Sequence, residues 1–349
     1  MAVIESQLAR FPKGQLYFFF EEIQNVDGWN GVLKKYFDLS SRLKFVISGS
    51  SSLFIATSTQ ESLAGRLQEI RVYPMGFGEY LNLHYKTELP PTSLFATDNL
   101  VSQATFLKEK LFEYLSFGEF PYLPFLPGWE EKREYLLDFV IGKVIEHDLP
   151  RLRRILGPAE LKNLADVLFI NAGGIIQMQN LGSDIGLSLQ TLRDYLGLLE
   201  KACLFSQIYN RGIGFRQRSL RQRKVYSTST NALVFKLSSS PTSELFNLHL
   251  GQIIENYVFN YLSRASLGEI FFFRQRQVKE VDFIVSVSDK TMPIEVKYQA
   301  NLKPSDYKSL IYYCHQEKLS EAVVITNDTH QLFKLDNVTL RLIPAYFLV

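Results

Sequence analysis

Residues 271–299 read FFFRQRQVKEVDFIVSVSDKTMPIEVKYQ, and this stretch decides the fold of the C-terminal part of the chain. Two segments of strand length, Glu280–Val287 and Met292–Tyr298, are rich in apolar and β-branched residues. A short polar loop separates them, which is typical of two strands that pair as a hairpin. The apolar side chains of this predicted hairpin are Val281, Phe283, Ile284, Ile294 and Val296.

Charged side chains interrupt the apolar pattern at one end of this hairpin. Glu295 and Lys297 lie two positions apart, so they project from the same face of their strand. Asp282 meets them if the two strands pair. Buried charge is costly unless it is paired or binds a metal; Mg²⁺ would be held by both carboxylates, and the lysine could hold or activate a water. The alternative is an ordinary hairpin whose polar face is solvated.

The composition is that of a folded globular chain of two or three domains. Of the 349 residues, 46% are hydrophobic and 21% are charged. Cys203 and Cys314 are the only cysteines, which excludes a disulfide framework and a thiolate metal cluster. No apolar run reaches the ~18 residues of a membrane span, and the N-terminus lacks a secretory pattern. We therefore expect a cytoplasmic protein with no membrane partner.

The N-terminal third predicts a parallel α/β unit. An apolar run at residues 15–23, QLYFFFEEI, is typical of a buried parallel strand with acids at its carboxyl end. A helix is predicted at Trp29–Leu39 and a second apolar strand at Leu43–Ser52. Open α/β sheets place ligand sites at the carboxyl ends of such strands, although solvated strand ends are the alternative. The polar residues at these two ends are Glu21, Glu22, Ser48 and Ser50.

This region resembles an AAA+ ATPase group that is common in archaea and bacteria. FFFEEIQNVDGWNGVLKKYFD is similar to its Walker B strand and following helix, ISGSSS to its sensor strand, LAGR at residues 63–66 to its arginine turn, and YPMGFGEYL at residues 73–81 to the segment after it. The resemblance implies ATP and Mg²⁺ as cofactors and a homo-oligomer formed through this domain. The implied roles are the Mg²⁺-side acid for Glu21, water polarisation for Glu22, the sensor for Ser48 and a phosphate-facing arginine for Arg66.

Two departures from the AAA+ pattern bear on activity. Glu21 stands where the group usually has Asp, and its side chain is one methylene longer. No G-x-x-x-x-G-K-[ST] loop occurs in the sequence, and this loop holds the nucleotide phosphates. In the resembled group it lies upstream of the Walker B strand. We therefore expect no autonomous ATP hydrolysis, whether the cause is truncation or a degenerate ATPase remnant, and a working ATPase would need a phosphate loop from outside this chain.

The middle of the chain predicts helices and then a winged helix. The resemblance implies that the helices at Leu100–Phe117 and Glu130–Glu146 serve as a lid and connector. The alternative, which we favour, is that they serve packing alone. At residues 177–208 leucines recur at helical spacing across a break at Gly186, and Ser188 is a predicted N-cap for a helix at Leu189–Lys201. This helix-turn-helix pattern is followed by a strand and then by the basic segment GIGFRQRSLRQRKVY.

The order of two helices and a basic hairpin resembles a winged helix. Because the net charge of the chain is only +2, affinity for DNA would have to come from such a local patch. The alternative is a winged helix used for packing or oligomerisation, with the basic residues solvated. The candidate contacts to nucleic acid are Arg216, Arg218, Arg221, Arg223 and Lys224.

The C-terminal domain follows the linker-like segment SSSPTS at residues 238–243. A helix bearing Glu255, the hairpin, a helix at Lys303–Glu317 and a strand at Ala322–Asn327 come in that order, and a last strand or two follow. This order, with EVD and then IEVK, resembles the PD-(D/E)XK nuclease fold, which the AAA+ group carries at its C-terminus. The resemblance implies Asp282 and Glu295 as metal acids, Lys297 as the catalytic lysine and Glu255 as an accessory acid, with Arg274 and Gln277 as contacts to substrate.

Together these patterns predict an α/β multidomain chain. The expected parts are a partial P-loop AAA+ core at residues 1–90, a helical connector at 91–157, a winged helix at 158–237 and a restriction-endonuclease-like domain at 244–349. The expected function is a truncated AAA+ protein with a Mg²⁺-dependent nuclease that acts on DNA. The alternative is a non-catalytic DNA- or protein-binding module in which the ATPase and nuclease sites are both degenerate.

Overall fold

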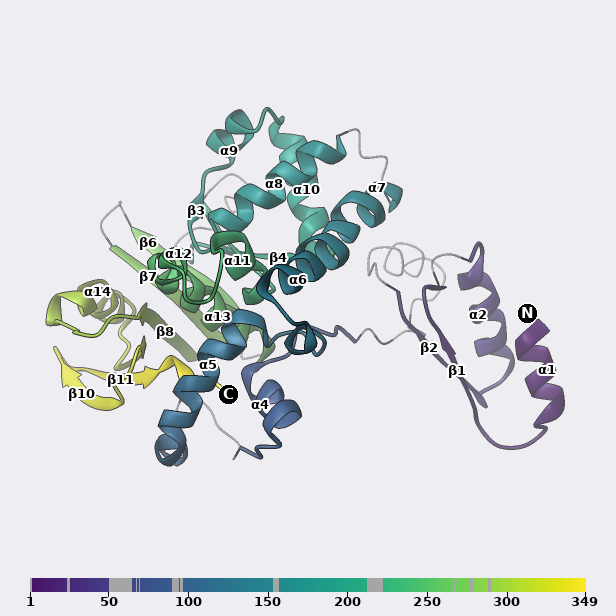
Figure 1. Ribbon diagram of the computed structural model, residues 1–349, viewed down its shortest axis with the longest axis horizontal. Helices are drawn as coiled ribbons and strands as arrows, with labels where there is room; N and C mark the ends of the chain where they lie inside the picture. Colours follow the sequence, from purple (N-terminus) through teal and green to yellow (C-terminus); the bar gives the residue numbers. More distant parts are fainter. Residues whose placement is uncertain are drawn as a thin grey trace. The chain divides into compact units, whose positions relative to one another are not determined.

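The computed structural model of the chain describes residues 2–23, 26–49, 65–66, 68, 70–89, 94, 97–152, 157–211, 222–265, 268–275, 279–287 and 290–349. The chain divides into two compact units. Unit 1 comprises Met1–Val72 and Gly142–Pro158, and unit 2 comprises Tyr73–Ile141 and Ala159–Val349. Many of their helices and strands are labelled in Figure 1. Within the described residues, no helix combines the length and the apolar character needed to cross a membrane.

Unit 1 contains a parallel pair of strands with a helix between them. β1 and β2 pair in register from Leu16 opposite Leu43 to Phe20 opposite Ile47. The core between strands and helices is formed by Ile4, Phe18, Ile23, Trp29, Leu33, Tyr36 and Leu43. The elements are α1 Ala2–Arg10, β1 Leu16–Phe20, α2 Trp29–Leu39, β2 Leu43–Ile47, the π-helical η5 Val144–Asp148, and α7 Leu149–Leu152.

The first strand differs from the sequence expectation of full burial. Phe18 points into the core, but Tyr17 and Phe19 on the other face are 60% and 71% exposed. Val46 on β2 is also exposed. Successive side chains alternate between the faces of a strand, and only one face of this pair packs against α2 within the described part of unit 1. The apolar run at residues 15–23 therefore buries only one face of β1.

Unit 2 begins with helices and continues into two sheets. The predicted helix at residues 130–146 is present, but from Tyr135 onward its turns are π-helical. The elements are α4 Phe77–Tyr85, η2 Asp98–Gln103, α5 Ala104–Phe117, η3 Leu123–Phe125, α6 Trp129–Glu134, η4 Tyr135–Gly142, α8 Pro158–Ile170, β3 Ile175–Ile176, α9 Met178–Asp184, α10 Leu189–Lys201, β4 Phe205–Tyr209, β5 Arg223–Ser227, α11 Thr230–Leu237, α12 Glu244–Leu248, α13 Leu250–Arg264, β6 Glu269–Gln275, β7 Lys279–Val287, β8 Lys290–Lys297, η8 Pro304–Tyr307, α14 Lys308–Glu317, β9 Glu321–Thr326, β10 Gln331–Leu335, β11 Val338–Pro344 and η9 Ala345–Phe347.

The helix-turn-helix prediction is confirmed by α9 and α10, which precede a three-stranded sheet of order β3-β5-β4. The Ser188 hydroxyl accepts a hydrogen bond from the Thr191 amide at 3.1 Å and caps α10 as expected. Most of the basic segment, with Arg216, Arg218 and Arg221, lies outside the described residues.

Replacement of Ser188 by alanine should destabilise unit 2. The loss of the cap leaves an amide of the first turn of α10 without its partner, which costs about 1 kcal/mol of unfolding free energy. Trp29 and Trp129 are the only tryptophans and lie in different units, so Trp129 fluorescence in a Trp29→Phe background reports unit 2. Urea unfolding should show the loss in Ser188→Ala and near-parity in Ser188→Asn, because asparagine also caps. Equal stability of all three proteins would contradict the role of the cap.

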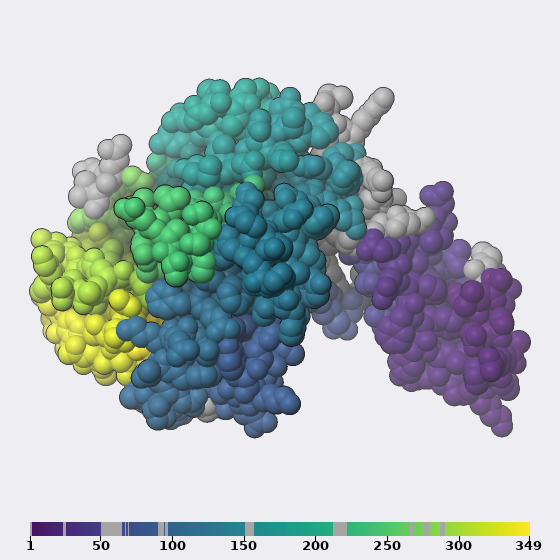
Figure 2. Space-filling model, in the orientation of Figure 1, coloured from purple at the N-terminus to yellow at the C-terminus, as the bar shows by residue number. Residues whose placement is uncertain are grey.

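The second sheet of unit 2 has six strands in the order β10-β11-β9-β8-β7-β6. The predicted hairpin is present as β7 and β8, which pair antiparallel with Phe283 opposite Ile294. α13 packs on one face of this sheet against Phe272, Phe283 and Ile294. α14 packs on the other face, in a core that includes Val281 and Ile284 (Figure 1). In the space-filling view the last strands, in yellow, adjoin the yellow-green segment before them (Figure 2).

A buried polar junction ties α5 to α11. The Glu119 amide donates to Asn231 Oδ1 at 2.8 Å, and Asn231 Nδ2 donates to the carbonyls of Tyr114 and Leu115 at 2.9 and 2.8 Å. Glu119 Oε2 in turn accepts from the Asn231 amide and the Ser229 hydroxyl. Asn231 is fully buried and uses both ends of its side-chain amide, so this Glu119–Asn231 junction fixes how the two helices meet.

Candidate active site

The structure brings the four predicted nuclease residues of unit 2 together where the β7–β8 ladder ends. Phe283 and Ile294 are the last paired residues, and one step further Asp282 Oδ2 accepts a hydrogen bond from the Val296 amide at 3.0 Å. Lys297 Nζ lies 2.6 Å from Glu295 Oε1 on the same strand. The alternation that predicted this pairing is therefore confirmed in the geometry.

A lysine from the other sheet lies at the centre of the same site. Lys224 on β5 is 2% exposed, and its ammonium lies 3.0 Å from Glu255 Oε1, 2.8 Å from Glu280 Oε1 and 3.3 Å from Asp282 Oδ1. The Tyr226 hydroxyl donates to Glu255 Oε1 at 2.7 Å. The three acids that contact Lys224, together with Glu295 and Lys297, form a group that we call the carboxylate cluster. Its members are Glu255, Glu280, Asp282, Glu295, Lys224 and Lys297.

Sequence reasoning assigned Lys224 to a wing and left Glu280 and Tyr226 out. The same alternation that joined Glu295 to Lys297 puts Lys224 and Tyr226 on one face of β5, and Glu280 and Asp282 on one face of β7. That signal was present in the sequence. The contact between the two strands was not, because residues 224 and 282 are far apart along the chain.

The backbone of Gly173 packs closely against the Glu255 carboxylate. Gly173, at φ +78°, lies so near that a Cβ placed there would be 3.2 Å from Glu255 Oε1. The Gly173 amide donates to the Val225 carbonyl at 2.8 Å, so this turn is held against β5. A side chain at this position would both strain the backbone and push on the glutamate.

Burial and mutual repulsion perturb the acids of the cluster. Burial, and then the charge of Asp282, raises the pKa of Glu295 to about 8. The same two causes in the same order raise the pKa of Glu255 to about 7. Burial acts to lower the pKa of Lys224, but the surrounding acidic groups outweigh it and hold that pKa well above 10.5. Lys224 is therefore charged at neutral pH, whereas the two glutamates hold protons that a nearby cation would release.

The cluster has more acids than bases. Four carboxylates face the ammonium groups of Lys224 and Lys297 and, at the rim, the Arg274 guanidinium, which leaves a formal excess of one negative charge when all are ionised. Glu295 Oε2 is buried and has no hydrogen-bond partner among the described atoms. Buried polar oxygens are rarely left in this state. Both facts point to room for additional positive charge.

A hard divalent cation fits this donor set chemically, because Mg²⁺ prefers carboxylate oxygens. Glu295 Oε2 is the oxygen that lacks a partner. In the described part of the chain, however, no three acidic, histidine or cysteine side chains are grouped closely enough to hold a metal as they stand. The ammonium of Lys224 lies among the oxygens of Glu255 and Asp282 instead.

Other predicted substrate contacts are placed differently. Arg274 lies at the rim of the cluster, where its guanidinium is 3.6 Å from Glu280 Oε2, and Gln277 is outside the described residues. Arg223 is buried, and its guanidinium donates to Gln207 Oε1 at 2.7 Å. As they stand, Arg223 and Lys224 therefore do not present their charges to solvent as a DNA-binding wing would require, because both belong to the interior of β5.

In unit 1 the predicted nucleotide residues are partly assembled. The Ser48 amide donates to the Phe20 carbonyl at 2.9 Å, which holds Ser48 beside the strand end that leads into Glu21 and Glu22. Arg66 is not brought to this end. It makes a bidentate ion pair with Asp38, near the end of α2 and just before β2 begins, and Ser50 lies outside the described residues.

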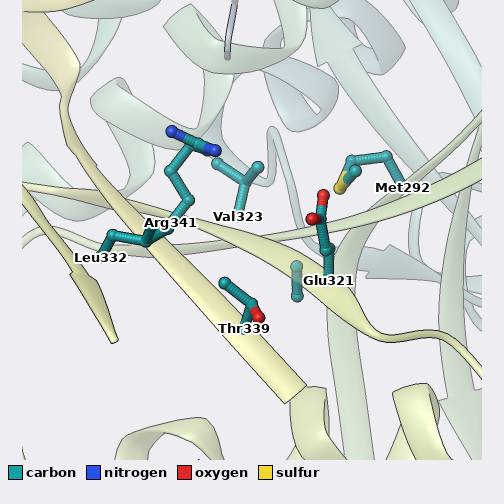
Figure 3. A pocket seen from close by; sticks show the side chains of 7 residues that line it. Met292, Glu321, Val323, Leu332, Thr339 and Arg341 are labelled. Atoms are coloured by element: carbon teal, nitrogen blue, oxygen red, sulfur yellow. The ribbon is translucent and has the colours of Figure 1, made fainter. Parts of the chain in front are cut away.

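A shallow pocket on the sheet is separate from the carboxylate cluster. Its lining comes from β8 to β11, with Glu321 and Arg341 as the charged side chains (Figure 3). No member of the carboxylate cluster lines it. The seven lining residues are Met292, Glu321, Ala322, Val323, Leu332, Thr339 and Arg341. We assign no function to it.

Comparison with known families matches residues 2–81 to an AAA domain. The chain carries an AAA domain. Residues 108–238 match the domain of unknown function DUF8612, and residues 250–347 match the domain of unknown function DUF4143. The carboxylate cluster therefore draws Lys224 from the DUF8612 match and its other members from the DUF4143 match. No nuclease family is among these matches.

Two relatives match nearly the whole chain. An uncharacterized protein of Methanocaldococcus jannaschii is 27% identical over 347 residues, which cover 97% of this chain and 70% of the relative. An uncharacterized protein of Haemophilus influenzae is 24% identical over 339 residues, which cover 94% and 77%. No solved structure matches the chain significantly. These relatives support the association of the three segments in one protein.

Proposed function

We propose that unit 2 contains a metal-dependent phosphodiesterase of the PD-(D/E)XK type, attached to an AAA domain and acting on DNA. The observation that carries this proposal is the convergence of Glu255, Asp282, Glu295 and Lys297 where the β7–β8 ladder opens. Two strands and one helix supply these groups, in the order that the nuclease pattern requires. The unpartnered oxygen of Glu295 supports it further.

Each residue has a definite task in this proposal. Asp282 and Glu295 would hold the metal, and Glu255 lies on the other side of the Lys224 ammonium, which both Glu255 and Asp282 contact. Bound Mg²⁺ would lower the pKa of a water and offset charge on the scissile phosphate. Lys297, at the rim of the cluster, orients the attacking water and contributes positive charge close to the phosphate.

DNA is the proposed substrate because unit 2 also contains a helix-turn-helix followed by a small sheet. α10 carries Gln190, Thr191 and Arg193 on its first turns, and the sequence after β4 contains the basic residues Arg216, Arg218 and Arg221. Phosphate contacts by such a segment would bring a duplex to the protein without regard to sequence. Binding to DNA should therefore weaken steeply as salt is raised.

The proposal predicts DNA cleavage that depends on divalent metal and on the cluster. Purified protein incubated with supercoiled plasmid and Mg²⁺ or Mn²⁺ should nick it, and chelation should stop the reaction. Asp282→Asn and Lys297→Ala should each lower the rate about a hundredfold or more, because each removes a charge acting on the reacting groups. Gel quantification of nicked and linear plasmid over time measures the rate.

Lys334→Ala serves as the matched control, because Lys334 is an exposed lysine of the same sheet on β10. Its rate should equal that of the unmodified protein. Cleavage that persists unchanged in Asp282→Asn would identify a contaminating nuclease. The absence of cleavage with every metal and DNA form tested would refute the proposed activity.

A second candidate is a non-catalytic module that binds DNA or another protein. The position of Lys224 favours it, because an ammonium among the carboxylates satisfies part of their charge without a metal. It predicts DNA binding or partner binding that is unchanged by Asp282→Asn, together with no cleavage. Gel-shift titration of both proteins at the same salt concentration separates the two candidates.

The AAA domain extends the proposal to nucleotide binding by unit 1. Glu21, Glu22 and Ser48 lie at the neighbouring ends of β1 and β2, as expected for an Mg²⁺-nucleotide site. Because the sequence contains no phosphate-loop pattern, hydrolysis of ATP is not part of the proposal. Self-association through this unit is also proposed, and sedimentation with and without ATP tests it.

A further inference from the structure

We propose that Lys224 is the resident cation of the carboxylate cluster and that a divalent metal binds by displacing its ammonium from Glu255 and Asp282. This inference uses the proposed function only to place the metal at Asp282 and Glu295. It concerns how metal is admitted to the site, and it makes Lys224 a residue that sets metal affinity. The strand that carries it belongs to a different sheet from the strands that carry the acids.

The position of the ammonium is that of a bound cation. Three carboxylates, one from α13 and two from β7, contact Lys224 Nζ at 2.8 to 3.3 Å. Its side chain is 2% exposed, so water does not share in this coordination to any large extent. A lysine ammonium is a compact point charge, and it can satisfy the same oxygens that a metal ion would.

The ammonium satisfies the cluster only in part. With Lys224 in place among Glu255, Glu280 and Asp282, Glu295 Oε2 stays buried and without a partner among the described atoms. A divalent ion would supply that missing contact. Metal and Lys224 therefore compete for the same oxygens, while the deficit at Glu295 favours the metal when its concentration is high.

The Lys224 ammonium can also keep one of its contacts when it leaves Glu255 and Asp282. Glu280, its nearest partner at 2.8 Å, is the most exposed acid of the cluster, and its other carboxylate oxygen is 3.6 Å from the Arg274 guanidinium. An ammonium that leaves Glu255 and Asp282 can keep this contact at the rim. Displacement then costs two ion pairs and preserves the third.

The test is a titration with Mn²⁺ alone, followed by electron paramagnetic resonance of the free ion. Lys224→Gln should bind Mn²⁺ about tenfold more tightly than the unmodified protein, or better, because the competing charge is gone. Lys236→Gln is the matched control; Lys236 pairs with Asp166 on α8, outside the cluster. The double variant Lys224→Gln with Asp282→Asn should lose the gain, which places the ion at the cluster.

A second measurement needs no variant and applies even if Lys224→Gln fails to fold. In the unmodified protein, amine acetylation of Lys224 followed by mass spectrometry should increase when Mn²⁺ is raised to the highest soluble concentration. Acetylation of Lys236 should stay constant. Labelling of Lys224 that does not respond to Mn²⁺ would overturn the proposal, and so would equal or weaker Mn²⁺ binding by a folded Lys224→Gln protein.

These outcomes are separate from those of the cleavage assay, since neither one measures catalysis. Exchange of Lys224 for Mn²⁺ in a protein that cuts no DNA would refute the proposed phosphodiesterase and support the present inference. Cleavage with no response of Lys224 to metal would do the reverse.

Discussion

Asn231→Ala is expected to lower the free energy of unfolding of unit 2 by about 3 kcal/mol or more. The substitution removes an amide that is fully buried and bonded at both ends in the Glu119–Asn231 junction. The amide of Glu119 and the carbonyl of Leu115 then lose this partner, whereas the Tyr114 carbonyl keeps its hydrogen bond from the Gly118 amide at 2.7 Å. Each buried polar group left unsatisfied costs about 1–3 kcal/mol, which is why this effect is large.

Urea unfolding followed by Trp129 fluorescence in the Trp29→Phe background measures this loss. Trp129 packs against Phe235 on α11, with 4.6 Å between ring centroids, so it reports the helix that carries Asn231. Asn180→Ala is the matched control, since Asn180 is an exposed residue of α9. A loss for Asn231→Ala no greater than that of the control would show that the junction contributes little to stability.

The stability of unit 2 without metal should fall as pH rises from about 5 to about 8. Folding raises the pKa of Glu255 to about 7 and that of Glu295 to about 8, from an ordinary value of 4.5. Between these values the folded chain binds protons that the unfolded chain has released. Each such proton lowers the unfolding free energy by up to about 1.4 kcal/mol per pH unit as pH increases.

The groups that face these two glutamates explain the direction. Asp282 repels both anions, and Lys224, Lys297 and Tyr226 only partly offset burial. Glu295→Gln stays neutral at every pH and should therefore flatten the dependence, whereas the exposed control Glu317→Gln on α14 should not. Urea midpoints in chelator at both pH limits give the result. A midpoint that rises with pH would contradict these pKa shifts.

Local sequence patterns were enough to predict several elements of the fold, including the hairpin that carries Asp282, Glu295 and Lys297. The hairpin, the α10 cap at Ser188 and the helix at residues 29–39 all follow from spacing within a few residues. The pairing of Glu295 with Lys297 also follows from alternation along a single strand. In these cases the residues that decide the geometry are neighbours in sequence.

The remainder depends on contacts between distant segments. β6 and β10 were not predicted, because their sequences carry no clear alternation and their place is set by pairing with β7 and β11. Lys224 appeared to belong to a basic surface segment until β5 was seen to lie within the unit beside α13 and β7. Arg66 likewise pairs with Asp38, 28 positions earlier, which no local pattern indicates.

The placement of Lys224 limits how this protein can change by recombination. The segment at residues 250–347 matches a family separate from the one that covers residues 108–238, which would suggest two exchangeable modules. Yet a gene that received the later segment alone would encode the four clustered acids without the ammonium that contacts three of them. The two segments are therefore expected to be inherited together, and a chimera of unrelated parents should be less stable if its donor of β5 supplies no lysine at this position.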